Sequence, residues 1–339
     1  MIELLIDYSF FLLKVVTIVI VIILPLLIIS SANRHKKFGE KGHLIIKNLS
    51  ERLDKMGTAI LSSEMDKKSF KKFIKDKNKK KKKQKSPEKQ SVYVLNFYGD
   101  IQATGVNKLK EEINAILSSK SKCKEVVLKV ESGGGSAYAY GLCAAELKRL
   151  TDNKISLTVC IDKIAASGGY LMSCVANKII AAPWAVVGSI GVIAQLPNLH
   201  RLLKKNAIDI EMHTAGRYKR TLTTLGKNTP TGRKKFIKEL EELHSVFKDF
   251  VKENRPVIDV KKVATGEVWQ GDQAKKIGLI DEIATADDYL LKLSSKFNLL
   301  ELDYYERKPI GEKLGIATQD LIEKTVLKLY EIINKNRFF

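Results

Sequence analysis

Residues 125–150, EVVLKVESGGGSAYAYGLCAAELKRL, predict the fold class of this chain. Glu125–Val130 is a short, mostly apolar run rich in β-branched residues, which is typical of a buried strand. A glycine loop follows at 131–136, and Tyr138–Leu150 then has apolar residues at helical spacing. A strand that passes through a tight loop into a helix is the repeating unit of α/β domains.

The same alternation continues on both sides of this stretch, which predicts an α/β domain with largely parallel strands covered by helices. The other strands that we expect are Val92–Phe97, Ser156–Ile161, Lys178–Ala182 and Ile208–His213, and the other helices are Asn107–Ser118 and one that starts near Ala165. The chain contains no internal repeat, so we expect one such unit per chain.

The N-terminus carries an apolar segment, Phe10–Ile29, whose roughly 20 residues are enough to span a bilayer as a helix. A cleaved signal peptide is the alternative, and Ser30 and Ala32 offer small residues at a cleavage spacing. A signal peptide needs a positive segment before the apolar run, whereas Glu3 and Asp7 lie there. We therefore expect an uncleaved transmembrane anchor at residues 1–32.

Basic residues directly after this segment favour a cytoplasmic location for the rest of the chain, although long domains cross membranes regardless of charge. They are Arg34, His35, Lys36, Lys37 and Lys41. A second apolar run, Ile179–Leu196, is an alternative membrane span. Pro183, Gly188 and Gly191 interrupt it, and buried parallel strands have the same appearance, so we expect strands there.

Much of the formal net charge of +21 lies in one short run. Residues 66–90 contain 13 Lys against three acidic residues, which is a net charge of +10. The run has no nucleic-acid-binding motif, so we expect no nucleic-acid partner. Like charges at this density repel, which predicts an extended, solvated linker that could also contact anionic lipid headgroups.

The remaining boundaries follow from this linker. Residues 33–65 have the apolar spacing of a short juxtamembrane helical segment, and the globular domain is expected at 91–300. Residues 301–339 are expected to form a C-terminal helical extension, since apolar residues recur at helical spacing between Gly311 and Asn334.

Cysteine and histidine spacing argues against a metal site. Cys123, Cys143, Cys160 and Cys174 form no C-x-x-C pair, and the histidines do not complete a zinc pattern. Buried free cysteines are the simpler explanation, and we expect neither a metal nor a cofactor.

Three glycine-containing loops are candidates for chemistry: 131–136 (ESGGGS), 165–170 (AASGGY) and 188–192 (GSIGV). Free backbone N–H groups in such loops can bind an anion or an oxyanion. A tight turn explains the first loop equally well, and the pattern of a phosphate-binding loop is not met. Ser167 begins a helix between small residues, where a serine acts either as a nucleophile or as an N-cap.

A serine nucleophile needs a base. None of His35, His43, His200, His213 and His244 lies in a motif of a Ser-His-Asp enzyme. A lysine can serve if burial favours its neutral form. Lys219 follows the expected strand Ile208–His213, but composition alone does not distinguish it from the other lysines.

Four ordered motifs resemble the signal peptide peptidase family of the SppA type, and in particular its shorter SohB branch. They are AASGGY (165–170), GSIGV (188–192), HTAGRYKRTLT (213–223) and ATGEVWQGDQAKKIGLIDEI (264–283), and the resemblance runs from Ser91 to Ile283. It implies a ClpP/crotonase-like α/β fold with stacked parallel sheets. It also implies a serine endopeptidase of the bacterial inner membrane that uses a Ser–Lys dyad and no cofactor, acts on signal peptides or other polypeptides and assembles as a homo-oligomer.

The resemblance assigns a role to each matching residue. Ser167 is the expected nucleophile, Lys219 the general base, and Ser189 the residue that orients the lysine. The backbone N–H groups of Gly134 and Gly168 are the expected oxyanion hole. Where the family has Ser-Pro-Gly-Gly in the first loop, this chain has Gly133 in place of the proline, which loosens the backbone.

Three alternatives to an active Ser–Lys peptidase remain open at this point. A crotonase-type acyl-CoA enzyme shares the fold but needs neither Ser167 nor Lys219. A membrane scaffold without activity would keep the fold alone. A serine hydrolase with a histidine base has His213 as its nearest candidate in sequence. The GEVW to GLID segment at 266–281 is expected to pack against the domain and not to act in catalysis.

Overall fold

The computed structural model describes residues 42–83, 90–119 and 122–306, together with residues 12, 14 and 17. Residues Leu44–Tyr304 form one compact unit. None of the helices in the described ranges is long and apolar enough to cross a membrane. Apart from those three residues, the expected span Phe10–Ile29 lies outside the described residues, as does the expected C-terminal helix at 311–334.

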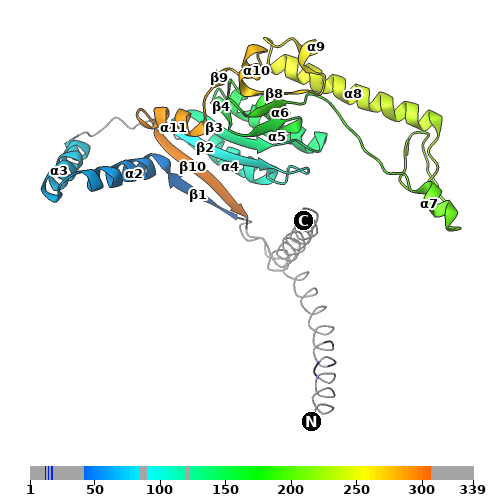
Figure 1. Ribbon diagram of the computed structural model, residues 1–339, viewed down its shortest axis with the longest axis horizontal. Coiled ribbons are helices and arrows are strands. Elements are labelled where there is room, and N and C mark those ends of the chain that lie inside the picture. The colour runs from blue at the N-terminus through cyan, green and yellow to red at the C-terminus, as the bar shows by residue number, and fades with distance from the viewer. Residues whose placement is uncertain are drawn as a thin grey trace, which may run out of the picture. The chain divides into compact units, whose positions relative to one another are not determined.

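Strands and helices alternate along the described chain (Figure 1). The strands are β1 (Gly42–Asn48), β2 (Ser91–Gly99), β3 (Cys123–Ser132), β4 (Ser156–Ile161), β5 (Ile164–Ala166), β6 (Lys178–Ala181), β7 (Val186–Gly188), β8 (Val268–Gln270), β9 (Glu282–Ile283) and β10 (Asn298–Glu306). The helices are α2 (Leu49–Glu64), α3 (Lys67–Lys83), α4 (Val106–Ser118), α5 (Ala137–Asp152), α6 (Gly168–Ser173), α7 (His200–Lys205), α8 (Pro230–Asn254), α9 (Val260–Val263), α10 (Gly271–Lys276) and α11 (Ala286–Ser294).

The strands form one branched sheet. Its main path has the order β1-β10-β2-β3-β4-β6-β9, and the pairs from β10 to β9 are parallel. β3 pairs with β4 along Glu125–Lys129 and then, at Ser132, with Ala165 of β5. β5 pairs with β7 in parallel, and β7 with β8 antiparallel. The branch brings the loops that follow β3, β5 and β7 to one region, and the expected α/β class is confirmed.

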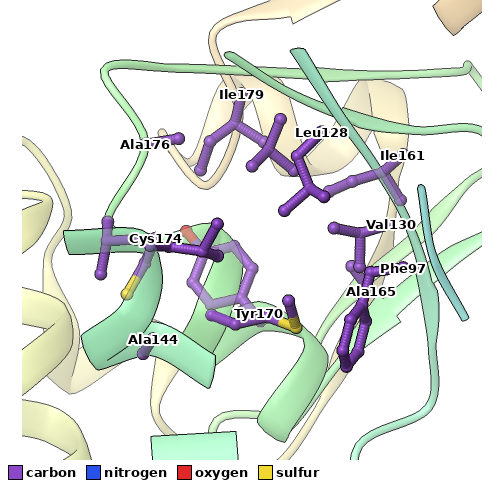
Figure 2. Packing of buried hydrophobic residues seen from close by; sticks show 14 of the residues in the cluster. Phe97, Leu128, Val130, Ala144, Ile161, Ala165, Tyr170, Cys174, Ala176 and Ile179 are labelled. Carbon is purple, nitrogen blue, oxygen red and sulfur yellow. The ribbon is translucent and has the colours of Figure 1, made fainter. Parts of the chain in front are cut away.

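The larger of two core clusters in the described chain lies between the sheet and helices α4, α5 and α6, and the smaller one includes residues of α11. Figure 2 shows Tyr170 of α6 on one side of the cluster, with Leu128, Val130 and Ile161 of the sheet on the other. All four side chains are 3% exposed or less. Packing of this kind fixes the start of α6, because a buried residue near the beginning of a short helix leaves it little freedom to shift.

An ion pair connects the end of α8 to the segment that follows α10. Arg255, which is 6% exposed, donates to both carboxylate oxygens of Asp281 at 2.8 and 2.9 Å. The same carboxylate accepts the N–H of Ile179 at 2.7 Å. Asp281 ends the GLID sequence, so this segment joins α8 to strand β6 and has the packing role that the sequence indicated.

Two expectations about secondary structure were wrong. Residues 208–213 form no strand, because no described strand lies beside them to share hydrogen bonds. The lysine-rich run is not an extended linker up to residue 83, since it forms helix α3. Phe70 and Ile74 line a pocket against α2, and Lys77 donates to Asp54 at 2.6 Å, so packing offsets the repulsion among the lysines.

Two further details refine the expected elements. The apolar run Ile179–Leu196 contains strands β6 and β7, as expected, in place of a second span. Residues 33–65 were expected to be partly helical. Their described part is strand β1, which joins the sheet beside β10, followed by helix α2.

Candidate active site

Ser167 lies at a sharp turn between β5 and α6. Its φ of 51° is in the left-handed region, which a non-glycine residue adopts only at a cost. Its N–H donates to the carbonyl of Gly188 at 2.8 Å. It occupies the N-cap position of α6, but its side chain makes no capping hydrogen bond. The hydroxyl is therefore left for another use, which weakens the N-cap explanation.

Ser189 follows the neighbouring strand. Ala166 pairs with Gly188 in the parallel ladder, so Ser167 and Ser189 are the next residues along two adjacent strands. Ser189 also has a φ of 51°, and its N–H donates to the carbonyl of Glu267 at 2.6 Å. The structure thus brings together two of the residues that the motifs selected.

The glycine loop after β3 touches the beginning of α6. A Cβ atom added to Gly134 would lie 2.7 Å from the backbone nitrogen of Gly168 and 2.7 Å from Cβ of Ser167, so only glycine allows this approach. The N–H of Gly134 donates to Oγ of Ser132 at 3.0 Å. Within the described part of the chain, the N–H groups of Gly168 and Gly135 have no hydrogen-bond partner. The start of the helix therefore offers one free donor directly after Ser167, at Gly168, and the loop offers another at Gly135.

Lys219 lies elsewhere. It is exposed, in a segment that contacts the first turns of α8: Nζ of Lys235 lies 5.6 Å from the centre of the Tyr218 ring, and a Cβ on Gly232 would lie 2.2 Å from the carbonyl of Thr221. The other end of α8 is buried at Val251 and joins the domain through Arg255. About 29 Å of helix separates Gly232 from Val251.

The chain is similar to known proteins over most of its length. Models of peptidase family S49 match residues 149–300, and models of its N-terminal region match residues 3–147. A protein named probable protease SohB from Haemophilus influenzae is 45% identical over 94% of both chains. One of the same name from Buchnera aphidicola subsp. Schizaphis graminum is 44% identical over 98% of both. This chain belongs to peptidase family S49.

The solved structures include a mutant of the 1510-N membrane-bound stomatin-specific protease, with 16% identity and a TM-score of 0.40 over 61% of this chain and 85% of that one. A plant relative, the chloroplastic serine protease SPPA of Arabidopsis thaliana, is 32% identical over 57% of this chain and 28% of its own length. The family match and the two relatives named probable protease SohB confirm the resemblance to this peptidase family.

A peptidase needs a binding surface for its polypeptide substrate. A pocket of about 430 Å³ lies beside the glycine loop, and Tyr98, Glu131, Gly133 and Ile164 contribute to its lining. Tyr98 is 69% exposed, and Nζ of Lys163 pairs with Glu131 at 2.9 Å. The pocket combines an aromatic wall with a paired charge, next to the candidate oxyanion hole.

His213, the alternative base, is exposed in the same segment as Lys219. Its Nε2 lies 3.5 Å from a carboxylate oxygen of Glu211. It has no hydrogen bond to Ser167 in the structure. The position of His213 therefore gives it no advantage over Lys219 as the base of this S49 peptidase.

Proposed function

We propose that this S49 chain is a membrane-anchored endopeptidase in which Ser167 attacks the scissile peptide bond and Lys219 is the general base. The observation that carries the proposal is the turn at Ser167. Its hydroxyl caps no helix, its backbone is held in a strained conformation, and Gly134 and Gly168 lie against it. Strain of this kind is found where a fold presents a nucleophile.

The reaction is acyl transfer. Neutral Lys219 accepts the proton of Ser167 as Oγ bonds to the carbonyl carbon, and the tetrahedral oxyanion forms. The C–N bond then breaks, and the lysine returns the proton to the leaving amine. Water hydrolyses the acyl-enzyme, again with the lysine as base. Ser189, beside Ser167, orients the lysine amine.

The N–H of Gly168 is one donor to the oxyanion. The N–H of Gly134, the second donor expected from the motif, already bonds to Ser132. The Gly134 N–H can donate to the oxyanion only if it also keeps, or gives up, its hydrogen bond to Ser132. The next amide, that of Gly135, has no hydrogen-bond partner in the described structure. We therefore propose that the loop provides its second donor from the Gly134–Gly135 pair.

The position of Lys219 favours a dyad that forms between two copies of the chain. The segment that carries it is rich in exposed apolar side chains, including Ile193 at 89%, Leu202 at 56% and Met212 at 47%. Exposed apolar surface of this extent indicates an interface. If the segment packs on a neighbouring copy, Lys219 enters that copy's site and loses water, which favours the neutral amine that a base requires. The proposed homo-oligomer thus completes the active site.

Attachment to a membrane rests on the apolar segment Phe10–Ile29, which we propose to be a transmembrane helix. Helix α3 supports a cytoplasmic location for the part of the chain that follows this segment. Its exposed lysines share one side, while Phe70, Ile74 and Lys77 face α2. We call this side the lysine face of α3; it consists of Lys67, Lys68, Lys71, Lys72, Lys75 and Lys79. Such a face suits the anionic headgroups of a cytoplasmic leaflet.

The proposed substrates are signal peptides and other membrane-associated polypeptides, because an anchored enzyme meets chains near the bilayer. The branched sheet agrees with the ClpP/crotonase-like fold that the resemblance implied. An acyl-CoA enzyme of that fold would not need a Ser167 hydroxyl that makes no helix-capping hydrogen bond. A peptidase is therefore the better supported function.

A fluorophosphonate probe tests the proposal. We expect the full chain in detergent to be labelled at Ser167 and to cleave fluorescein-casein. Ser167→Ala should abolish both, leaving less than about a thousandth of the wild-type rate, with an unchanged unfolding temperature. Labelling at another residue, or no labelling of the folded chain, would contradict the assignment.

A further inference from the structure

A hydrogen-bond relay lies beneath the glycine loop. The N–H of Gly134 donates to Oγ of Ser132 at 3.0 Å, Oγ of Ser132 lies 2.5 Å from the hydroxyl of Tyr140, and that hydroxyl donates to the carbonyl of Asp100 at 2.7 Å. A carbonyl only accepts, so the single proton of Tyr140 is directed to Asp100. Ser132 must therefore donate to Tyr140, and the relay runs in one direction from Gly134 to Asp100.

The two side chains in the middle of the relay are buried. Tyr140 is 0% exposed and Ser132 is 2% exposed. Burial raises the pKa of Tyr140, so its hydroxyl keeps its proton at neutral pH. Since an unmade hydrogen bond at a buried site is costly, the three bonds hold one another in place.

Three glycines leave space for the side chains of Ser132 and Tyr140. A Cβ on Gly99, at the end of β2, would lie 2.4 Å from both Oγ of Ser132 and the hydroxyl oxygen of Tyr140. A Cβ on Gly168 would lie 2.4 Å from Cγ of Tyr140, and one on Gly169 would lie 2.6 Å from the Ser132 carbonyl. The two glycines after Ser167 therefore make room for the relay.

We infer that Ser132 and Tyr140 are positioning residues for the candidate oxyanion hole, an inference that rests on the proposed function. Tyr140 supports both halves of the hole. Its ring packs against Gly168, which carries one donor, and its hydroxyl acts through Ser132 on Gly134, which begins the other half. Neither side chain touches the reacting atoms.

The relay also accounts for Gly133. A proline at that position restricts φ, and glycine gives up this restriction. Here the hydrogen bond from the N–H of Gly134 to Oγ of Ser132 limits the rotation of the peptide group between Gly133 and Gly134. The turn after β2 adds a second tie, because the N–H of Ser136 donates to the carbonyl of Ile101 at 2.8 Å. Hydrogen bonds thus supply the pre-organisation that the loop's covalent geometry lacks.

Two substitutions remove single groups from the relay. Tyr140→Phe keeps the ring against Gly168 and removes the hydroxyl, whereas Ser132→Ala removes the acceptor of the Gly134 N–H. We expect each to slow fluorophosphonate labelling and the kcat for fluorescein-casein about tenfold, with KM unchanged within about twofold. The double variant should be no slower than the slower single variant, because both break the same chain of bonds.

Tyr170→Phe is the matched control. Tyr170 is also 0% exposed, lies on α6 and donates its hydroxyl to the carbonyl of Leu279 at 2.9 Å, away from the loop. Its loss should lower the unfolding temperature comparably while the labelling rate stays within about twofold of wild type. Equal slowing in Tyr170→Phe, or a wild-type rate in Tyr140→Phe, would overturn the inference.

Hydrogen exchange of the full chain in detergent separates this inference from the proposed function, since it needs no activity. We expect the two hydrogen-bonded amides of the loop, those of Gly134 and Ser136, to exchange at least about tenfold faster in Tyr140→Phe and in Ser132→Ala than in wild type and Tyr170→Phe. Unchanged exchange of the Gly134 and Ser136 amides would overturn the positioning role even if Ser167 is the nucleophile. Faster exchange in a chain that the probe does not label would leave the positioning of the loop supported and refute the peptidase.

Discussion

The carbonyl of Gly188 accepts the backbone N–H of Ser167 at 2.8 Å, and this bond joins two loops that lie far apart in the sequence. Because Ser189 follows Gly188 directly, the same pair of strands positions both the proposed nucleophile and the residue proposed to orient its base. We therefore expect Ser189→Ala to lower kcat by about tenfold, well short of the loss in Ser167→Ala, since both members of the dyad remain. Casein hydrolysis by the two variants measures the difference, and equal losses would contradict an orienting role for Ser189.

The identity of the base is tested by Lys219→Arg. A guanidinium stays charged and cannot accept the serine proton, so this variant should lose nearly as much activity as Lys219→Ala, about a thousandfold. His213→Ala should remain within about twofold of wild type. The pH–rate profile of each variant on fluorescein-casein provides the comparison. An active arginine variant together with an inactive His213 variant would assign the chemistry to a histidine-assisted hydrolase.

The lysine face of α3 is tested in nanodiscs that contain the full chain. In anionic bilayers we expect its lysines to react several-fold more slowly with an amine-acetylating reagent than in neutral bilayers. High salt should remove the protection, because ionic screening weakens contact with headgroups. Mass spectrometry of the acetylated peptides gives the result.

A matched variant pair controls for total charge. One variant replaces Lys68, Lys71, Lys72 and Lys75 with Gln, and the other replaces Lys261, Lys262, Lys275 and Lys276 with Gln. Only the first should lose the preference of the chain for anionic bilayers. If the lysines of α3 are acetylated equally slowly in neutral and in anionic bilayers, another copy of the chain, and not the lipid headgroups, covers this face.

Stability should fall as pH rises through the titration of Glu112. This side chain is 0% exposed, and burial raises the pKa of its carboxyl from 4.5 to about 7, although the Tyr304 N–H and the Lys108 amine act in the opposite direction. The folded state thus holds a proton that the unfolded state releases above pH 4.5. The associated stability is complete below pH 4.5 and is lost as pH rises to about 7.

Glu112→Gln carries a permanently neutral side chain and should remove this dependence. We expect it to increase the free energy of unfolding by about 2 kcal/mol at pH 8 and to change it little at pH 4.5. Thermal unfolding at the two pH values tests this. An equal effect of the substitution at both values would mean that the carboxyl does not titrate in that range.

The sequence predicted the elements whose pattern is local. β4 was predicted at Ser156–Ile161, where it lies. The other predicted helices and strands between residues 91 and 182 begin within a few residues of their expected positions, whereas the short strand β5 was not predicted. The strand expected at 208–213 does not form, because a strand needs a neighbouring strand with which to share hydrogen bonds. Helix α3 was missed because contact with α2 outweighs the charge repulsion that the composition suggested.

The candidate site was predicted in part for the same reason. Motifs selected Ser167, Ser189 and the glycine loop, and the branched sheet brings these together. The relay through Tyr140 was not predicted, because its members lie on β3, α5 and the turn after β2 and meet only in three dimensions. Gly99, two residues after the strand predicted at Val92–Phe97, is a local signal of a close approach at that point.

Mixing two inactive variants tests most directly whether the active site forms between copies. Ser167→Ala and Lys219→Ala chains are co-expressed, and casein hydrolysis of the mixed oligomer is measured beside each variant alone. If Lys219 of one copy serves Ser167 of another, roughly a quarter of the sites contain both residues and activity returns to about that fraction of wild type. If the mixture is as inactive as its components, while both variants fold and assemble, the dyad does not form between copies.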